Sequence, residues 1–451
     1  MNKKQKVLII TIVLLGYFII LVDTSLVFTC SKEISQSFQM NTNLSAWISN
    51  SYALTFGSLL LLGGKLGDAY GRKKIFMLGL VLFGISSGMV GFAPNAILLI
   101  IFRAIQGIGA AIIAPATLAI IMDNFMGQER IAAISIYGTM SGIGVSVGLI
   151  IGAGITTILS WRWGFLVNLP IVAILLILTA KFLPTNKFTT EKLDIFGSII
   201  SCLALIFIIN GISGIGSHAF SIVIGILLLG YFIFYEKRIS HPILPLTLFS
   251  DKKRNLAYLI CFAYSGAITS FWFFTPLLLQ TEFKMTPLIV GVSFLPMTIA
   301  NFISATMVDY FTKKLGSIKL LFIGLIITTI GFSSLTLFKS GLTYMLFIAL
   351  PMIIIGLGQG LILSPVTSIA VMNTPQDLTG VSSSVINVML QIGGAFGLSI
   401  VTVLSHTTED VLAFHYRAVG FSILSIIALL FSGYLLIMIL KKKKNVVNKK
   451  V

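Results

Sequence analysis

The sequence has few charged residues for its length, and acidic residues are the scarcest of them. Of 451 residues only 10% are charged, with 14 Asp and Glu against 31 Lys and Arg, and 57% are hydrophobic. The mean hydropathy is +1.03. A soluble protein of this length would expose too much apolar surface. The composition therefore excludes an ordinary soluble protein and indicates an all-α integral membrane protein.

Cysteine and histidine are also rare, which argues against metal and disulfide chemistry. Three cysteines without paired spacing predict neither a disulfide framework nor a metal site. The histidines are expected in loops, so they form no ligand cluster and supply no catalytic group at depth. A membrane-embedded enzyme is therefore not expected, and an ion channel would need a pore loop or charged ring that is absent. These residues are Cys30, Cys202, Cys261, His218, His241, His406 and His415.

Long apolar runs fill most of the chain instead. A membrane helix needs about 20 mostly apolar residues to cross roughly 30 Å of hydrocarbon. The N-terminal run lacks a small-residue cleavage site, so it is expected to be an uncleaved first helix. Fourteen spans are predicted, at 7–29, 44–63, 75–93, 97–121, 131–156, 163–183, 194–212, 219–236, 255–279, 286–308, 317–337, 342–368, 380–405 and 417–440.

Membrane topology explains the net charge of +17 better than nucleic-acid binding does. With fourteen spans and a cytoplasmic N-terminus, most of the 31 Lys and Arg fall in cytoplasmic segments, as the positive-inside rule requires. Both termini are then cytoplasmic. The basic tail over 441–451 is interpreted as a topology anchor, with contact to anionic lipid as the alternative. Five basic residues fall outside: Lys32, Arg162, Lys284, Lys339 and Arg417.

Two pairs of segments resemble each other across the halves of the chain. GIGAAIIAPATLAII (107–121) and GQGLILSPVTSIAV (358–371) share Gly-x-Gly followed by Pro-x-Thr. GKLGDAYGRKK (64–74) has a weaker counterpart in ATMVDYFTKKLG (305–316). Internal repeats of this kind indicate a transporter with a site between the repeats.

The repeats predict two six-helix bundles, over 1–183 and 255–440. The segment 184–254 is expected to carry helices seven and eight as a spacer hairpin, and 441–451 forms the tail. Glycines in the fifth helix predict close helix packing, with bending of a gating helix as an added hypothesis. They are Gly138, Gly142, Gly144, Gly148, Gly152 and Gly154.

The stretch GGKLGDAYGRKK (63–74) places five charges between two apolar runs. Its glycines, including Gly64 and Gly71, are expected to allow a tight turn at the membrane surface. Asp68 can accept hydrogen bonds from amides at a helix N-terminus. Arg72, Lys73 and Lys74 can pair with Asp123 or Glu129, which would make a cytoplasmic latch; topology anchoring alone is the simpler alternative. A phosphate-binding loop is excluded because Gly-Lys-Ser/Thr is absent.

This stretch resembles the helix 2–3 loop of the major facilitator superfamily. The chain is similar, more narrowly, to its fourteen-helix drug:proton antiporter branch. Further matching segments are LVDTSLVFTC (21–30), WISNSYAL (47–54), IIFRAIQGIGAA (100–111), SWRWGFLVNLP (160–170) and NVMLQIGGAFGLSI (387–400). The resemblance implies a multidrug efflux pump of the cytoplasmic membrane. Departures are Leu149 where helix five normally has proline, Phe28 where helix one has Asn, and Lys32 at a proline position.

Two charged residues are predicted inside spans, where charges are costly and functional candidates by default. Asp23 and Arg103 lie at the same depth, because their helices run in opposite directions. Desolvation favours a protonated carboxyl, whereas a nearby guanidinium favours the ionised form. We therefore expect Asp23 to be the proton-coupling site, tuned by Arg103, with Glu33 as a second candidate at the wetter rim. The alternative is an ion pair that fixes helix packing.

A drug cavity is mostly apolar and aromatic with a few polar groups, and aromatic faces can hold flat cations. No acidic residue is expected at mid-membrane in the C-terminal bundle, which favours monocationic, zwitterionic or neutral substrates. Each lining residue can equally serve packing or face lipid. The candidates are Tyr52, Gln106, Tyr137, Phe271, Trp272, Asn301, Asn387 and Gln391.

The sequence thus predicts a monomeric, proton-coupled exporter of amphiphilic drugs and dyes that works by alternating access. It needs no cofactor beyond the proton gradient. A symporter or exchanger for one specific metabolite is the alternative, kept open by Leu149.

Overall fold

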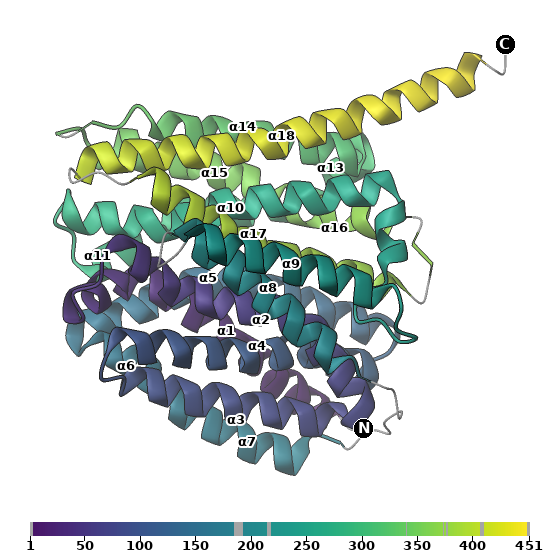
Figure 1. Cartoon of the computed structure of the whole chain (residues 1–451), viewed down its shortest axis with the longest axis horizontal. Coiled ribbons are helices and arrows are strands. Elements are labelled where there is room, and N and C mark those ends of the chain that lie inside the picture. Colours follow the sequence, from purple (N-terminus) through teal and green to yellow (C-terminus); the bar gives the residue numbers. More distant parts are fainter. Residues whose placement is uncertain are drawn as a thin grey trace. The chain divides into compact units, whose positions relative to one another are not determined.

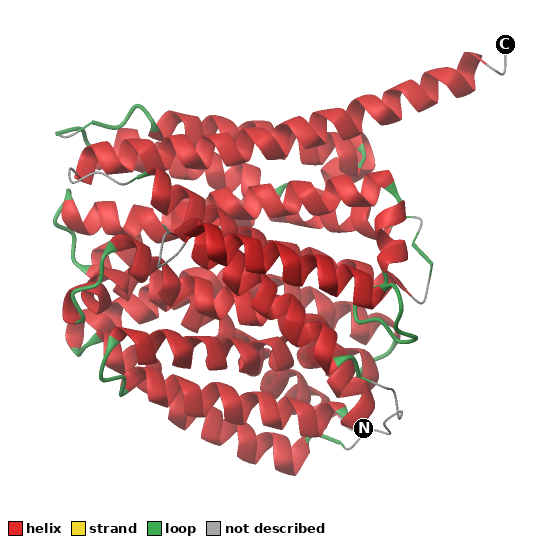
Figure 2. Ribbon diagram, viewed as in Figure 1, coloured by secondary structure: helices red, strands yellow, loops and turns green. Residues whose placement is uncertain are grey.

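The structure is a computed structural model that describes residues 3–184, 193–213, 218–339, 341–372, 374–375, 378–405 and 410–448. Helices and short loops make up all of these residues, and no strand occurs among them (Figure 2). The all-α prediction is confirmed for this part of the chain.

Nine helices lie in the described part of the chain before residue 237 (Figure 1). They are α1 (Lys3–Ser37), α2 (Thr42–Tyr70), α3 (Arg72–Gly91), α4 (Ala96–Asn124), α5 (Gly127–Ile158), α6 (Trp161–Leu166), α7 (Asn168–Phe182), α8 (Ile195–Ser213) and α9 (His218–Glu236). A 3₁₀ turn, η1 (Leu246–Ser250), follows. The remaining helices are α10 (Lys252–Thr281), α11 (Pro287–Ser293), α12 (Leu295–Thr306), α13 (Val308–Leu315), α14 (Ser317–Leu335), the π-helix η2 (Met345–Ala349), α15 (Leu350–Gly360), α16 (Leu363–Val371), α17 (Thr379–Leu404) and α18 (Asp410–Asn448).

Twelve helices among the described residues are long and apolar enough to cross a membrane. Several combine two neighbouring helices, such as Trp161–Phe182, which joins α6 and α7. The two other predicted spans, 44–63 and 131–156, fall within α2 and α5, helices of 29 and 32 residues that are not among the twelve. Twelve spans are therefore established by length and composition, and fourteen stay a prediction.

The chain divides into two compact units. One unit contains Met1–Pro245 and Lys284–Val292, and the other contains Leu246–Phe283 and Ser293–Val451. In the first unit α2 packs on α4, α3 on α4 and α1 on α5, and in the second α10 packs on α17 and α18. The predicted division at 183, 254 and 440 stays a prediction.

Helices α8 and α9 form a hairpin that packs against α2. Ile200, Phe232 and Ile243 share an apolar cluster with Leu61 and Leu62 of α2. The hairpin therefore does more than separate two bundles, because its side chains complete the packing of α2.

The chain leaving α9 is also fixed by polar contacts. Buried Glu236 accepts hydrogen bonds from the backbone N–H groups of Ile243 and Leu244, both at 3.3 Å. Lys65 in α2 donates to the carbonyl of Pro242 at 2.7 Å. These contacts tie the segment after α9 to the end of α2 that carries the charged stretch.

Glycines of α5 bring this helix into close contact with α1. An added Cβ at Gly148 would lie 2.2 Å from Ser25 Oγ and 2.7 Å from Val22 Cα, and one at Gly152 would lie 2.9 Å from Leu26 Cβ. These distances leave no room for a side chain, so the close packing predicted for helix five is confirmed at these positions. The approach sets the position of the α1 segment that flanks Asp23.

The internal repeat has a structural counterpart in two glycines with positive φ. Gly71 (φ 96°) separates α2 from α3, and Gly316 (φ 80°) separates α13 from α14. Glycine adopts this region without the steric cost of a Cβ. The counterpart of the charged stretch therefore has a chain break at the same place. The other repeated pair differs in its backbone, because α4 runs through Pro115 whereas α15 and α16 are separated before Pro365.

The Gly-x-Gly pairs of both halves pack closely against neighbouring helices. An added Cβ at Gly107 would lie 2.1 Å from Thr55 Oγ1 of α2, and one at Gly360 would lie 2.0 Å from Ser304 Oγ of α12. The glycines in these repeated segments thus serve contact between neighbouring helices.

The α1–α5 contact can be tested with matched alanine substitutions. Gly148→Ala is expected to lower the free energy of unfolding by about 1–3 kcal/mol through overpacking, measured as a lower melting temperature in detergent. Gly154→Ala is the control, since its Cβ would meet only Leu288 Cδ1 at 3.8 Å. Equal melting temperatures for the two variants would contradict the close contact.

Candidate functional site

A buried ion pair joins α1 and α4. Arg103 Nη1 lies 2.5 Å from Asp23 Oδ2, and both residues are 1% exposed. The prediction that these two charges lie at the same depth is confirmed, and they are in direct contact. Their roles in transport stay predictions.

Two amide side chains complete the surroundings of the carboxylate. Gln106, one turn after Arg103 in α4, donates from Nε2 to Asp23 Oδ1 at 2.7 Å and accepts from Arg103 Nη1 at 2.7 Å. Asn168, the first residue of α7, donates to Asp23 Oδ1 at 3.3 Å. Both carboxylate oxygens therefore accept hydrogen bonds, as a buried charge requires.

The guanidinium has further partners on α2. Arg103 Nε donates to the carbonyl of Ile48 at 3.2 Å. The guanidinium also lies 4.3 Å from the ring centroid of Tyr52, a distance at which a cation is attracted to an aromatic face. The cluster of Asp23, Arg103, Gln106, Asn168 and Tyr52, called the polar cluster below, therefore connects α1, α2, α4 and α7.

Asn168 and its partner on α3 were not among the predicted site residues. Asn168 Nδ2 also donates to Ser87 Oγ at 3.0 Å, and Ser87 Oγ donates to the carbonyl of Phe165 at 2.9 Å. Asn168 belongs to the conspicuous segment SWRWGFLVNLP (160–170), where a polar residue precedes a proline at the start of an apolar run. That pattern was a usable signal for Asn168, whereas Ser87 is one of many serines in spans.

Glu33 is separate from the polar cluster. It lies in α1 about 15 Å further along the helix axis than Asp23, at 1.5 Å per residue. It is half-buried, and its Oε2 is buried without a hydrogen-bond partner among the described residues. The expectation of an ordinary wet carboxylate is therefore wrong for this oxygen.

The charged stretch 63–74 is helical for most of its length, which corrects the predicted turn. Helix α2 continues to Tyr70, and only Gly71 has a positive φ. Gly63 instead serves close packing, since an added Cβ would lie 2.0 Å from the carbonyl oxygen of Ala111. Gly64 has room for a side chain, with Pro115 Cβ at 3.7 Å.

Arg72 is the centre of the predicted latch. It donates to Asp68 Oδ1 from Nη2 at 3.0 Å and to the carbonyl of Ala119 at 2.8 Å, and it pairs with Asp123. The arrangement joins the ends of α2, α3 and α4, and the predicted Arg72–Asp123 pair is confirmed. Asp68 accepts from the Arg72 guanidinium, and its predicted acceptance from helix amides stays a prediction.

The neighbouring charges have different partners from those expected. Lys73 donates to the carbonyls of Ala180 and Leu183 at the end of α7, at 2.8 and 2.7 Å. Glu129 pairs with Lys6 of α1 at 2.6 Å. Lysine at a helix C-terminus satisfies free carbonyls and complements the helix dipole, which explains why Lys73 is directed there.

The predicted cavity residues are distributed over the chain. Tyr52 and Gln106 belong to the polar cluster, and Tyr137 of α5 stacks on Tyr17 of α1 with ring centroids 4.4 Å apart. On α17, Asn387 is exposed and Gln391 is half-buried. All five lie on helices that cross the membrane in the predicted topology.

Three further candidates lie in the second unit. Fully buried Phe271 contacts the rings of Trp272 and Phe294, at centroid distances of 6.2 and 6.0 Å. Trp272 stacks on Phe294 at 4.8 Å. Half-buried Asn301 of α12 offers its carbonyl to Ser304 Oγ at 3.0 Å. Phe271 and Trp272 are thus part of an aromatic core in this unit.

Within the described ranges, no group of three or more His, Cys, Asp or Glu could hold a metal ion. The expected loop placement of the histidines is wrong for two of them. His218 begins α9, and His415 lies inside α18 with Nδ1 3.0 Å from the carbonyl oxygen of Thr336. His406 lies outside the described residues.

Comparison with known proteins identifies relatives along nearly the whole chain. The family model described as Major Facilitator Superfamily matches residues 13–398. The puromycin resistance protein pur8 of Streptomyces alboniger is 30% identical over 419 residues, which cover 90% of this chain and 83% of that protein. The multidrug transporter protein MdtP of Bacillus subtilis (strain 168) is 29% identical over 415 residues, covering 88% and 75%.

Solved structures share the fold at low sequence identity. A variant of the nucleoside transporter NupG aligns with a TM-score of 0.71 at 11% identity, over 95% of this chain and 99% of that one. A D-xylose-proton symporter aligns with a TM-score of 0.68 at 14% identity, over 93% and 96%. These likenesses show the fold alone.

The polar cluster generates a stability prediction. Asp23→Asn leaves Arg103 as an unpaired buried charge and is expected to cost about 3–5 kcal/mol of stability. Asp23→Asn combined with Arg103→Gln removes both charges and is expected to recover much of the loss. Melting temperatures in detergent measure both effects. A double variant as unstable as the sum of its single variants would contradict the direct charge pairing.

Proposed function

Because the chain belongs to the Major Facilitator Superfamily, it is a transporter and not an enzyme, and we propose that it is a proton-coupled antiporter. It exports amphiphilic drugs and dyes across the cytoplasmic membrane by alternating access. The observation that carries this proposal is the buried Asp23–Arg103 pair with its amide partners. Charged groups at this depth are costly and are retained in proton and substrate pathways.

Protonation of Asp23 is the proposed coupling step. The ionised carboxylate accepts from Arg103, Gln106 and Asn168. A proton on the carboxyl removes the negative charge that faces Arg103 and turns an acceptor into a donor. The cluster must then rearrange, and since it connects α1, α2, α4 and α7, the rearrangement reaches four helices. Proton uptake is thereby linked to movement of the unit.

The resistance and multidrug relatives support a drug substrate rather than a nutrient. Among the described residues of the second unit no Asp or Glu is buried. A second deep carboxylate would suit dications, so we propose monocationic, zwitterionic or neutral amphiphiles as substrates. Tyr52, Tyr137 and Gln391 are among the residues proposed to contact them.

We also propose fourteen membrane spans, with α2 and α5 added to the twelve apolar ones. Their lengths of 29 and 32 residues exceed the roughly 20 that a span requires. Both termini are then cytoplasmic, and the protein acts as a monomer. In this orientation the Asp68–Arg72–Asp123 cluster lies at the cytoplasmic surface.

Transport in liposomes tests the proposal. Purified protein is reconstituted with an imposed pH gradient and a fluorescent lipophilic cation. Addition of the cation is expected to collapse the gradient with the wild type and not with Asp23→Asn. Glu33→Gln is the matched control, because it neutralises the other candidate carboxyl of α1 and leaves the ion pair intact.

The outcomes separate the candidate functions. A response that survives in Asp23→Asn but is lost in Glu33→Gln would move the proton site to Glu33. If the wild type fails to respond to any cation, a symporter or exchanger for one metabolite becomes the better explanation.

The latch is tested separately. Asp68→Asn is expected to abolish transport while substrate binding is largely kept, because Asp68 contacts Arg72 at the membrane surface and not the polar cluster. Binding is measured by fluorescence of the dye with detergent-solubilised protein. Transport at the wild-type rate by Asp68→Asn would reduce this cluster to a topology anchor.

A further inference from the structure

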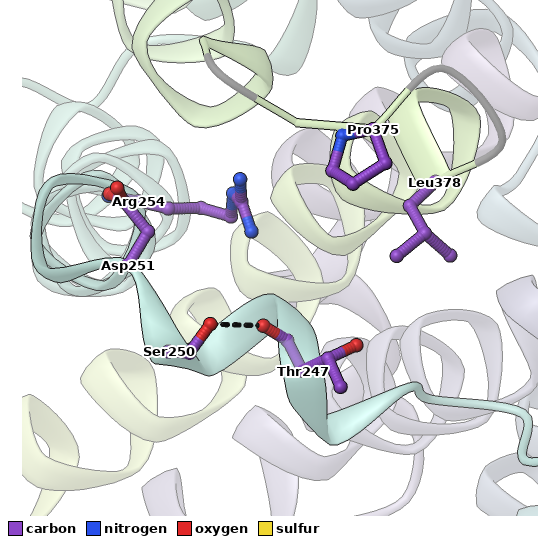
Figure 3. A pocket seen from close by; sticks show the side chains of 6 residues that line it. All are labelled: Thr247, Ser250, Asp251, Arg254, Pro375 and Leu378. Carbon is purple, nitrogen blue, oxygen red and sulfur yellow. Dashed lines mark hydrogen bonds between the residues drawn. The ribbon is translucent and has the colours of Figure 1, made fainter.

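A cavity of about 410 Å³ lies where α10 begins, within the second unit. Figure 3 shows it between the 3₁₀ turn η1, the first turn of α10, and the residues Pro375 and Leu378, which precede α17. Its volume is many times the roughly 30 Å³ of a water molecule. It is lined by Thr247, Ser250, Asp251, Arg254, Pro375 and Leu378.

Arg254 is the cation of this cavity. The residue is 4% exposed. Its Nε donates to the carbonyl of Ala370 in α16, and its Nη1 donates to the carbonyl of Leu248, both at 3.0 Å. Nη2 has no hydrogen-bond partner among the described residues. In Figure 3 the guanidinium points to the side on which Pro375 and Leu378 lie.

No carboxylate in the described part of the chain forms an ion pair with Arg254. Asp251 lines the cavity, but its Oδ1 accepts from the backbone N–H groups of Lys253 and Arg254 and caps α10. The contrast with Arg103 and Arg72, which both have carboxylate partners, is clear. A buried charge is costly unless it is paired, and Arg254 has no counter-ion among the described residues, so an anion in the cavity would offset that cost.

The rest of the lining suits a polar anion. Exposed Thr247 and Ser250 both line the cavity, and the Ser250 hydroxyl donates to the Thr247 carbonyl at 2.7 Å (Figure 3), so of the two hydroxyls that of Thr247 is left to donate to an anion. Lys252 is exposed beside them. The two N–H donors of Nη2 and the planar guanidinium match phosphate geometry.

We propose that this cavity, which we call the Arg254 pocket, binds a phosphate-bearing anion through the Arg254 guanidinium. The phosphate belongs either to the headgroup of an anionic membrane lipid or to a soluble phosphate. The first source rests on the proposed orientation, which puts the start of α10 at the cytoplasmic leaflet. Basic pockets between helices on that side are suited to anionic headgroups.

The bound anion would stabilise the joint between α10, α16 and α17. The Ala370 carbonyl accepts from Arg254 and also from Ser382 Oγ of α17 at 2.8 Å. Ser382 Oγ in turn lies 2.8 Å from the hydroxyl of Tyr258 in α10. A ligand on Arg254 therefore acts on a hydrogen-bonded contact shared by three helices.

Thermal unfolding of the purified full-length protein in detergent tests the proposal without relying on transport. Phosphatidylglycerol, phosphatidylcholine and inorganic phosphate are added separately. Phosphatidylglycerol or inorganic phosphate is expected to raise the melting temperature by a few degrees, and phosphatidylcholine is not. A rise with inorganic phosphate identifies a soluble source, and a rise with phosphatidylglycerol alone identifies a lipid.

Three variants make the result specific. The anion is expected not to raise the melting temperature of Arg254→Gln. It is expected to raise that of Lys252→Gln, which removes only an exposed neighbouring charge. If Arg254→Gln fails to fold, Ser250→Asp provides the test instead. It adds a negative charge at the cavity and keeps the Arg254 hydrogen bonds, so the anion is expected to raise its melting temperature less than that of the wild type. No rise with either anion, or an equal rise in Ser250→Asp or Arg254→Gln, would overturn the proposal. Loss of transport alone would bear on the proposed function and not on this site.

Discussion

The first unit depends on the burial of one ion pair. Asp23 and Arg103 are both 1% exposed, and two charges in a low-dielectric interior are tolerated only when their remaining donors and acceptors are also satisfied. Gln106, Asn168 and the carbonyl of Ile48 meet that requirement. Because the pair and these partners come from four helices, none of the helices can move far without breaking a hydrogen bond to a buried charge. The same constraint makes the pair sensitive to a single proton.

The geometry of this cluster rests on small residues that are not part of it. Gly148 and Gly152 let α5 approach α1 beside Asp23, and Gly107 lets α4 approach α2 one residue after Gln106. In a bilayer, helices associate by close packing more than by exclusion of water. A side chain at these glycines would separate the backbones by more than hydrogen bonds of 2.5 to 3.3 Å allow. The hydrogen bonds of the buried ion pair therefore depend on the close helix packing at these glycines.

The two halves of the chain share backbone breaks but differ in how they use arginine. Gly71 and Gly316 both adopt positive φ before a helix. In the first unit Arg72 has two carboxylate partners, Asp68 and Asp123. In the second, Arg254 is held by two carbonyls and faces a cavity. The two arginines do not occupy equivalent places in the repeat, because Arg72 follows the break at Gly71 whereas Arg254 lies at the start of α10.

The sequence by itself determined the helices and the depth of the charges. Apolar runs and loop charges are patterns of the linear sequence. They were enough to predict helices at nearly all the expected places and the common depth of Asp23 and Arg103. Which side chains meet depends on how each helix is rotated about its axis, and only tertiary packing decides that. The sequence therefore did not predict that Gln106 bonds both members of the ion pair, that Gly63 contacts Ala111, or that Arg254 lines a cavity. Whether an arginine has a counter-ion among the described residues depends on its neighbours in space, which no local sequence pattern records.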